Sequence, residues 1–328
     1  MKLFVTGSNG FIGSNLVRRL LADGHEVSGL VRPDSDLSFV EGVEYRRVAG
    51  DLADLAALRA GAAGAEVVFH VAALASDWGS YRTFYRTNVE GTAHVLAVAR
   101  DCGVRRVVHV SSTVVHGFTG FFDRSEDDPQ PPSRYPYVET KRLAEGLLFA
   151  AEGVEVTAIR PGNVFGPRDR VTSLPLLTAL RKGAMGVLDG GRRFTCPTYV
   201  ENLIDALVLA AVVPGAAGRA YLVTDGLAIT WREFTDALAD AIGVPRPKLS
   251  LPVPIARLAA AAMEGVWAGM GALKPPPLTR YRVANGGTDY HFSVKRARAE
   301  LGWAPRVGLS EAVRRTAEWF LALRPGRA

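Results

Sequence analysis

The sequence predicts an α/β fold built on a doubly wound parallel sheet, with a smaller C-terminal domain interleaved with it. Short apolar runs rich in valine alternate with helical segments through the first half of the chain, and this rhythm is typical of parallel strands joined by crossover helices. The first run also leads directly into a glycine loop that opens a helix. At 328 residues the chain is long enough for one large α/β unit or two closely packed domains.

The predicted elements follow one another in a regular order. Each strand is a short apolar run, and each helix has apolar residues at intervals of three and four. We expect strands at 3–6, 26–31, 67–71, 107–110 and 154–159, and helices at 13–23, 85–102 and 137–152. Functional residues are expected at the carboxyl ends of the strands, where sheets of this kind bind their ligands.

The first predicted strand is followed by Gly7-Ser-Asn-Gly-Phe-Ile-Gly13, which opens the first predicted helix. Glycines in this context let the backbone turn tightly and approach a pyrophosphate, whose charge faces the helix N-terminus. A strand-to-helix turn without a ligand is the alternative interpretation. The loop predicts a Rossmann-type dinucleotide site, with contacts from Gly7, Asn9, Gly10, Phe11, Ile12 and Gly13.

The alternation of strands and helices breaks after Pro161, where proline, glycine and arginine become frequent. A helix at 200–213 and a strand at 220–224 then return to the sheet before the chain leaves it again. We therefore predict two interleaved domains. They are a dinucleotide-binding domain at 1–165 that also receives about 196–225, and a substrate-binding domain made of 166–195 and 226–328.

The end of the second strand bears on the choice of cofactor, because a carboxylate there would bind the adenosine ribose of NAD. Val31 and Arg32 occupy this place. An arginine can pair with the 2′-phosphate of NADP, so we favour NADP(H) without excluding NAD(H); a solvated surface arginine is the alternative. Asp51, followed by Leu52, lies between the strands expected at 26–31 and 67–71 and is placed to meet the adenine, or otherwise to cap a helix.

A serine, a tyrosine and a lysine downstream of the loop predict hydride transfer to or from a carbonyl carbon. Tyr137 and Lys141 are four residues apart, so on a helix they share one face. The reference pKa of tyrosine is about 10, and Lys141 would supply the cation that lowers it. Ser112 would hydrogen-bond the reacting oxygen. A tyrosine beside a solvated lysine on an amphipathic helix is the alternative.

Composition and charge argue against several other functions. The net charge is +6, but acidic residues are mixed among the basic ones, so we expect a generally basic surface and no nucleic-acid partner. Cys102 and Cys196 form no Cys-x-x-Cys pair, and the histidines show no His-x-x-x-His spacing, so we expect no metal site. Because the N-terminus runs straight into a strand, we expect a cytoplasmic protein.

The stretch 251–273 is apolar and alanine-rich, with Arg257 and Glu264 as its only charges. Its length is close to the ~20 apolar residues that cross a bilayer, but the two charges and the alanine content argue against insertion. A lid or wall over a substrate pocket and an ordinary core helix both stay open. Peripheral membrane contact is a third alternative.

Six motifs in order resemble those of the extended short-chain dehydrogenase/reductase family. They are the loop Gly7 to Gly13, His70-Val-Ala-Ala73, Thr87-Asn-Val-Glu-Gly-Thr92, Ser111-Ser-Thr113, Tyr137-x-x-x-Lys141 and Arg160-Pro-Gly-Asn-Val-Phe-Gly-Pro167. The family's catalytic tyrosine, lysine and hydroxyl residue imply Tyr137, Lys141 and Ser112 here. Further cofactor contacts follow from the resemblance at Val71, Ala72, Ala73, Asn88, Pro161 and Val164.

Later motifs narrow the resemblance to one branch, which includes 3β-hydroxysteroid and 4α-carboxysterol dehydrogenases and reductases of long-chain 2-alkyl-3-oxoalkanoates. They are Asp77-Trp-Gly, Tyr221-Leu-Val-Thr-Asp-Gly226, Pro275-Pro-Pro-Leu-Thr-Arg280 and the segment from Phe292 to Trp303. This resemblance implies an NAD(P)-dependent dehydrogenase or reductase that interconverts a secondary alcohol and a ketone on a large apolar substrate. It also suggests a homodimer. Substrate contacts are expected from Trp78, Thr113 and His116.

Two other functions stay open. A nucleotide-sugar 4-epimerase or dehydratase would use the same three catalytic residues, hold NAD tightly and return the hydride to the substrate. Arg192 and Arg193 could then bind a diphosphate. A non-catalytic cofactor-binding protein would bind NADPH without turning over any carbonyl compound.

Overall fold

Seven parallel strands form one sheet in the computed structural model, which describes residues 1–323. From edge to edge the strands are β12 (Arg219–Val223), β7 (Glu155–Pro161), β5 (Arg106–Val110), β4 (Val67–His70), β1 (Lys2–Thr6), β2 (Glu26–Val31) and β3 (Arg46–Ala49). The order of the strands reverses between β1 and β4. This switch point is where sheets of this kind bind ligands.

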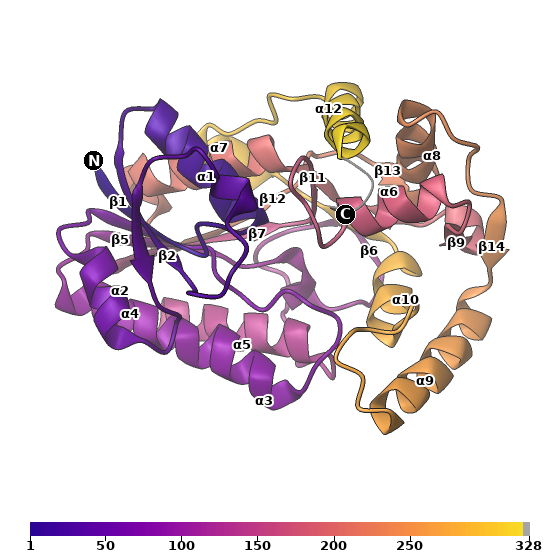
Figure 1. Ribbon diagram of the computed structural model, residues 1–328, viewed down its shortest axis with the longest axis horizontal. Helices are drawn as coiled ribbons and strands as arrows, with labels where there is room; N and C mark the ends of the chain where they lie inside the picture. The colour runs from indigo at the N-terminus through magenta and orange to yellow at the C-terminus, as the bar shows by residue number, and fades with distance from the viewer. Residues whose placement is uncertain (324–328) are drawn as a thin grey trace.

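Helices cover both faces of the sheet (Figure 1), because successive side chains of a strand point to opposite sides. On one face of the sheet, Leu3 and Val5 of β1 pack in an apolar cluster with α1 (Phe11–Ala22) and α7 (Val200–Val212). On the other face, Phe4 packs in a second cluster with α2 (Leu55–Ala62), α4 (Gly91–Asp101) and α5 (Pro136–Phe149). The prediction of a doubly wound α/β fold is confirmed.

The remaining strands form short pairs to one side of the sheet. Three pairs are parallel and the last is antiparallel. They are β6 (Phe121–Arg124) with β15 (Tyr290–Phe292), β8 (Asn163–Phe165) with β11 (Pro197–Tyr199), β9 (Gly186–Leu188) with β14 (Leu249–Leu251), and β10 (Phe194–Thr195) with β13 (Ile229–Thr230).

Six further helices lie in the second half of the described residues, 1–323. They are α6 (Ser173–Arg181), α8 (Trp231–Ala241), α9 (Val253–Gly269), α10 (Arg280–Gly286), α11 (Lys295–Leu301) and α12 (Leu309–Ala322). Four 3-10 turns complete the description at η1 (Ser38–Val40), η3 (Thr113–His116), η4 (Asp189–Gly191) and η5 (Pro214–Ala216).

The helix expected at 85–102 differs from the prediction in both its start and its geometry. It begins earlier, with α3 (Tyr81–Phe84), and passes through a π-helical turn, η2 (Tyr85–Glu90), before α4 starts. A π-helical turn adds a residue to the helix and often marks a functional position. Here it carries Asn88.

Helix α9 occupies most of the apolar stretch 251–273, and one of the interpretations left open for that stretch is wrong. It is not an ordinary core helix, because only Val253, Ala256 and Ala260 are buried along its length. No helix among residues 1–323 combines the length and the apolarity needed to cross a membrane.

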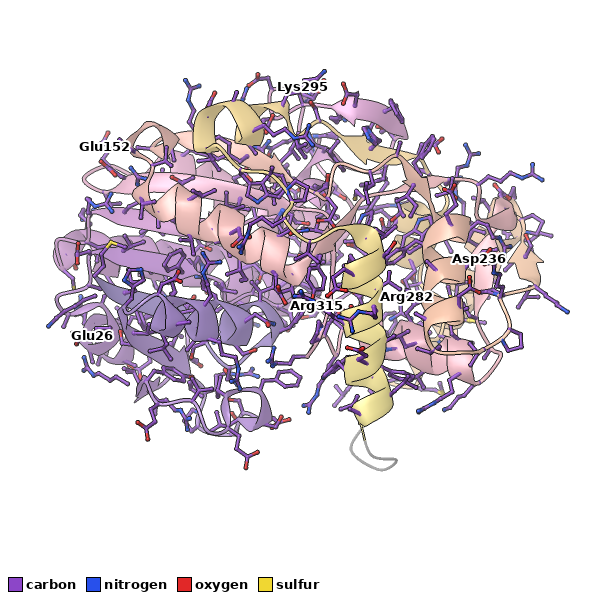
Figure 2. All side chains as sticks on the ribbon, turned by 90° about the horizontal axis from the view of Figure 1, so that it is seen from above. Glu26, Glu152, Asp236, Arg282, Lys295 and Arg315 are labelled. Atoms are coloured by element: carbon purple, nitrogen blue, oxygen red, sulfur yellow. The ribbon has the colours of Figure 1, made fainter. Side chains whose placement is uncertain are left out.

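The C-terminal segment is tied to α7 by polar contacts. Asn202 donates to Asp225 and to the Val307 carbonyl, both at 2.9 Å, and accepts from the N–H groups of Arg306 and Val307. Arg315 of α12, labelled in Figure 2, donates to Glu201 of α7 at 2.8 Å. The end of the described chain therefore packs on the helix that covers the sheet.

Candidate active site

The loops after β1 and β4 meet at the switch point. Gly7 has φ +67°, and a side chain there would bring its Cβ to 2.9 Å from the Cα atom of Ala72. The hydroxyl of Thr6 accepts hydrogen bonds from the N–H groups of Val71 and Ala72, at 3.2 and 3.1 Å. Glycine tolerates this close approach and this backbone conformation, so the segment Val71 to Ala73 lies directly beside the glycine loop.

The N-terminus of α1 has no side-chain cap and no acidic residue in its first turn. Gly10 is the N-cap residue, and its N–H donates to Gly7 O at 3.0 Å. A Cβ on Gly13 would lie 2.0 Å from Gly7 O, so the helix packs against the turn as closely as the backbone allows. Phe11 and Ile12, which begin the helix, are partly exposed. Free amides at the positive end of a helix fit a pyrophosphate, and these residues therefore fit a dinucleotide cofactor.

Arg32 comes directly after β2, at the edge of the glycine loop. Its side chain is exposed and makes no ion pair with any of residues 1–323. Asn9 links the glycine loop to the loop after β2, because its side-chain amide donates to Asp36 O at 3.0 Å. The guanidinium of Arg32 therefore stays accessible after β2, the strand whose end bears on the choice of cofactor in sheets of this kind.

Asp51 does not cap α2, because Asp54 does so by accepting from the N–H of Ala57 at 2.9 Å. Asp51 is exposed and accepts from the N–H of Ala53 at 2.8 Å. Leu52 is buried and packs against α4. The carboxylate of Asp51 thus stays accessible at the end of β3.

Two parts of the chain bring Ser112, Tyr137 and Lys141 into one region. Ser112 follows β5 and caps the 3-10 turn η3, while Tyr137 and Lys141 stand one turn apart on α5. Ser112 is 7% exposed and Lys141 is 2% exposed, whereas Tyr137 is half-buried. Proline at the first position of α5 favours a helix start there, which places Tyr137 in the first turn.

The ammonium of Lys141 is hydrogen-bonded to β5 rather than to the phenol of Tyr137. Burial raises the pKa of Tyr137, and the hydroxyl of Ser112 acts in the opposite direction. The ammonium of Lys141 donates instead to Val110 O at 2.6 Å. The predicted lowering of the tyrosine pKa by Lys141 is therefore not found in this arrangement, because the lysine charge is directed toward β5.

Two buried histidines lie near Lys141, and neither was predicted from the sequence as a site residue. The Nε2 atom of His109 lies 3.4 Å from Lys141 Nζ, and the rings of His109 and His70 are 5.0 Å apart. His70 contacts the hydroxyls of Thr6 and Thr92, at 2.9 and 3.0 Å. Burial lowers the pKa of His70 to about 3 and that of His109 well below its usual value, and the charge of Lys141 adds to both effects.

Both histidines are therefore neutral, and Lys141 is the charged group of the cluster. Burial lowers the pKa of Lys141 to about 8, against the opposing charge of Glu145. A histidine inside each of two apolar strand runs was the signal in the sequence, because buried strands seldom carry polar side chains.

Asn88 holds the loop after β4 in place. Its side chain accepts from the N–H of Leu74 at 2.7 Å and donates to Leu74 O and to the hydroxyl of Thr140. The asparagine is 2% exposed, so these contacts replace the water it would otherwise bind. The π-helical turn that carries Asn88 thus links α5 to the segment beside the glycine loop.

Pro161 ends β7 and is buried, while Val164 lies in β8 and is partly exposed. The neighbouring Gly162 packs against β11, and its N–H donates to the hydroxyl of Thr198 at 3.1 Å. Both predicted cofactor contacts therefore lie just beyond the carboxyl edge of the sheet, on the side of β5 and β7.

Aromatic side chains line the region next to Tyr137. The ring of Tyr281, from α10, meets that of Tyr137 edge-on at 6.2 Å and that of Phe118 at 5.2 Å. Phe118 also contacts Tyr135 and Tyr290. Tyr281 and Phe118 were not predicted from the sequence, because no local pattern indicates that α10 returns to α5.

The three predicted substrate contacts have different environments. Trp78 is partly exposed, and its indole N–H donates to Ala272 O at 2.8 Å. Thr113 is buried at 2% exposure, and its hydroxyl lies near the thiol of Cys196.

His116 is not placed to contact a substrate, and this expectation is corrected. Its side chain is fully buried, and its Nε2 lies 3.2 Å from the guanidinium of Arg160. Burial and Arg160 lower the pKa of His116 to about 4, so the ring is neutral.

Within residues 1–323, no group of three His, Cys, Asp or Glu side chains is arranged to hold a metal ion.

A model of the NAD dependent epimerase/dehydratase family matches residues 3–223 of the chain. The 2-alkyl-3-oxoalkanoate reductase of Stenotrophomonas maltophilia is 34% identical over 96% of this chain and 98% of its own length. The 3beta-hydroxysteroid-dehydrogenase/decarboxylase isoform 1 of Arabidopsis thaliana is 32% identical over 98% of this chain and 80% of its own. The resemblance inferred from the sequence motifs is confirmed.

Solved structures share the architecture. MoeE5 in complex with UDP-glucose and NAD superposes with a TM-score of 0.78 at 26% identity, covering 97% of this chain and 98% of that one. These two curated relatives are named as a reductase and a dehydrogenase, whereas the structural neighbour is in complex with a nucleotide sugar.

Proposed function

Because the chain belongs to the NAD-dependent epimerase/dehydratase family of enzymes, also called the extended short-chain dehydrogenase/reductases, we propose that it interconverts a ketone and a secondary alcohol on a large apolar substrate. The observation that carries the proposal is the meeting of Ser112, Tyr137 and Lys141 with an aromatic wall beside an uncapped helix N-terminus. A polar sugar substrate would not need that wall.

The nicotinamide cofactor supplies or accepts the hydride when it is bound. The free amides of α1 would hold its pyrophosphate, Asp51 its adenine, and the segment Val71 to Ala73 with Pro161 and Val164 its nicotinamide half. Asn88 supports this half indirectly, by holding the backbone of Leu74.

Tyr137 moves the proton. In the reducing direction its Oη donates to the carbonyl oxygen, and in the oxidising direction it takes the proton of the hydroxyl. Ser112 hydrogen-bonds the same oxygen and stabilises the charge that develops there. General acid–base catalysis of this kind contributes roughly 10²- to 10⁴-fold to the rate.

Lys141 stabilises the deprotonated tyrosine and the cofactor ribose. On a helix, side chains four residues apart have Cβ atoms about 5–6 Å from each other, so the ammonium would reach the phenol if the lysine side chain rotated away from Val110 O. His109 is neutral and offers Nε2 as an acceptor beside the ammonium.

The substrate is a lipophilic ketone or alcohol of the sterol or long-chain β-keto acid type. Support comes from the rings of Tyr281 and Phe118 beside Tyr137 and from the apolar substrates named for the two curated relatives. Trp78 and Thr113 are the further residues from which we expect substrate contacts.

We further propose NADP(H) as the preferred cofactor, supported by the unpaired Arg32 at the end of β2. Separate fluorescence titrations of NADPH and NADH test this on protein stripped of nucleotide. Arg32→Ala is expected to weaken NADPH binding at least about tenfold, as loss of a charged hydrogen bond does, and to leave NADH binding unchanged. The matched control is Arg298→Ala, an exposed arginine of α11. Tight NAD binding without this preference would contradict the assignment.

The activity is tested on a panel of long-chain β-keto acids and 3-ketosteroids, with oxidation of the reduced cofactor as the readout. Turnover of at least one such ketone, lost in Tyr137→Phe, is expected. A protein that binds NADPH and turns over none of them would fit the non-catalytic alternative.

A nucleotide-sugar epimerase is the second candidate, favoured by the likeness to MoeE5. One of the two arginines expected to bind a diphosphate is not free to do so, because Arg193 is paired with Asp289 at 3.0 Å. Arg192 is exposed. Purification with bound NAD and conversion of a UDP-sugar would favour this function.

A cytoplasmic homodimer is part of the proposal. A groove between α4 and α5 is lined by Ala93, Leu96, Ala97 and Leu147, with Arg100 and Glu152 also contributing. In a two-fold dimer, the Arg100 of one copy could pair with the Glu152 of the other, because such an interface is self-complementary. Light scattering on the purified protein tests the dimer, and a monomer at all concentrations would contradict it.

A further inference from the structure

Helix α9 and the residues directly after it expose an apolar face. Its large side chains recur at helical intervals on one side and are exposed to the following extents: Ile255 54%, Leu258 75%, Val266 56%, Met270 62% and Leu273 96%. A helix that is apolar on all sides is normally buried. Large exposed apolar patches mark interaction sites on soluble proteins.

The position of α9 leaves this face open. The helix lies at the margin of the molecule, at the lower right of Figure 1. Its inner side packs through Ala256 and Ala260 against Leu278 and Val283. The outer face is therefore not part of the core of the described chain.

The charges near this face are mostly basic, although the carboxylate of Asp189 lies at the start of α9 and accepts from the N–H of Val253 at 3.1 Å. Lys248, Arg257 and Lys274 are exposed, and none of them pairs with an acidic side chain among residues 1–323. Glu264 is the only acidic residue between 248 and 278, and it is paired with Arg280 at 2.5 Å. An apolar stripe with unpaired cations at its rim complements an anionic lipid surface.

We propose that the outer face of α9 binds the surface of an anionic lipid bilayer, with the helix lying in the plane of the interface. A second copy of the chain fits this face less well. A self-complementary contact through α9 would bring Arg257 and Lys274 of one copy against the same cations of the other.

The docked helix connects the bilayer to the active site. The indole of Trp78 donates to Ala272 O at 2.8 Å, just after α9. The neighbouring Asp77 accepts from the hydroxyl of Thr279 at 2.7 Å and pairs with Arg282. The C-terminal end of α9 is thus tied to the loop after β4, so that an apolar substrate dissolved in the membrane would enter beside Trp78. This last step rests on the proposed function.

Flotation of the purified full chain with lipid vesicles tests the docking. Vesicles of phosphatidylcholine alone are compared with vesicles that also contain phosphatidylglycerol. We expect the chain to float with the anionic vesicles and to bind phosphatidylcholine at least about fivefold less, since each cation near an anionic surface contributes about that factor. Absence of flotation with both vesicles would overturn the proposal.

Matched variants distinguish binding through the outer face of α9 from nonspecific adsorption to lipid. Leu258→Glu and Leu273→Glu are expected to lower vesicle binding at least about tenfold, as loss of a buried leucine contact does. Leu321→Glu makes the same change on α12, where Leu321 is 56% exposed, and should bind like the wild type. Equal binding by Leu258→Glu and the wild type would contradict the proposal.

Light scattering on the same variants examines the second-copy alternative. A dimer that Leu258→Glu converts to monomers, in a protein that does not float, would assign the face to contacts between copies and overturn the lipid proposal. Retention of the wild-type mass by Leu258→Glu supports it.

Activity measurements keep the docking distinct from the proposed function. Leu258→Glu should reduce a short, water-soluble ketone at the wild-type rate and lose rate only on a long-chain ketone delivered in vesicles. Failure of the wild type on every ketone, with flotation intact, would refute the function and leave the docking standing.

Discussion

Burial acts in opposite directions on the two residues that handle charge at the site. It raises the pKa of Tyr137, so the phenol keeps its proton at neutral pH, and it lowers the pKa of Lys141 to about 8. A protonated tyrosine is the form needed to donate to a carbonyl oxygen. The free protein is therefore in the protonation state that suits ketone reduction.

Tyr137→Phe removes the proton donor without changing the ring that meets Tyr281. We expect turnover to fall by roughly 10²- to 10⁴-fold while the fold and cofactor affinity stay intact. The measurement is kcat for ketone reduction beside a cofactor titration. Tyr135→Phe is the control. Among residues 1–323, the hydroxyl of Tyr135 hydrogen-bonds only with Arg280 O and the guanidinium of Arg134. Near-normal turnover in Tyr137→Phe would rule out the assignment.

Deprotonation of Lys141 should produce an alkaline limb in the plot of the rate of ketone reduction against pH. The lysine is an ammonium below about pH 8 and neutral above it, so the rate of ketone reduction should fall as the pH rises through about 8. Lys141→Arg, which stays charged, should lack this limb. A wild-type profile that stays flat through this range would show that the charge of Lys141 is not needed.

A change at His109 should shift the pH at which the rate of ketone reduction falls, because Nε2 of His109 is an acceptor beside the ammonium of Lys141. In His109→Phe we expect the limb to move down by about one pH unit, the equivalent of one charged hydrogen bond. His109→Gln keeps an acceptor and should restore it. A limb that stays near pH 8 in the phenylalanine variant, with an unchanged unfolding temperature, would make His109 a packing residue.

At the scale of elements, the glycine loop depends on close contact between backbone atoms. A Cβ on Gly13 would stand 2.0 Å from Gly7 O, whereas a Cβ on Gly146 of α5 would meet nothing within 4 Å. The first contact cannot be relieved by rotating a side chain. The second position is an ordinary exposed helix site.

The two glycines therefore give a matched pair. Gly13→Ala should cost about 2 kcal/mol of unfolding free energy, as overpacking does, and weaken cofactor binding at least tenfold. Gly146→Ala should instead raise the unfolding free energy by about 0.4–1 kcal/mol. Chemical denaturation measures both. Equal stability of the two variants would contradict the packing of α1 against the loop.

Local patterns predicted much of this architecture. The valine-rich runs, the loop Gly7 to Gly13 and the spacing of Tyr137 and Lys141 each lie within a few residues of sequence. The π-helical turn at Asn88 was missed because it forms only where α4 meets α5. The approach of Tyr281 to Tyr137 joins segments far apart in the chain. No local spacing encodes such a contact.

The environment of single side chains was also beyond local reasoning. His116 follows the serine motif closely, yet β7 contributes Arg160, which binds it in the interior. The exposure of the outer face of α9 could not be predicted for the same reason. The sequence of an apolar segment does not show whether another element covers it.

At the scale of the whole molecule, Asn202 joins α7, the loop after β12 and the C-terminal segment. It makes four hydrogen bonds, to Asp225, to Val307 O and to the N–H groups of Arg306 and Val307. The side chain is fully buried. Its partners lie more than 20 residues away, so the contact fixes how distant parts of the chain assemble.

Asn202→Ala leaves several buried polar groups without partners. We expect a loss of about 3 kcal/mol of unfolding free energy, measured by denaturant titration. Asn285→Ala removes one long contact of 3.3 Å to Asn163 and should cost much less. A loss below that of the control would show that the C-terminal segment is held by its apolar contacts alone.

The transfer of deuterium from a labelled nicotinamide tests the account most directly. Reduced cofactor carrying deuterium at the reactive carbon is mixed with the protein and a long-chain β-keto acid or 3-ketosteroid, and the product is analysed by mass spectrometry. We predict one deuterium on the carbinol carbon of a released alcohol, equal in amount to the oxidised cofactor, and none with Tyr137→Phe. Retention of NAD with no labelled alcohol, together with conversion of a UDP-sugar, would contradict the account.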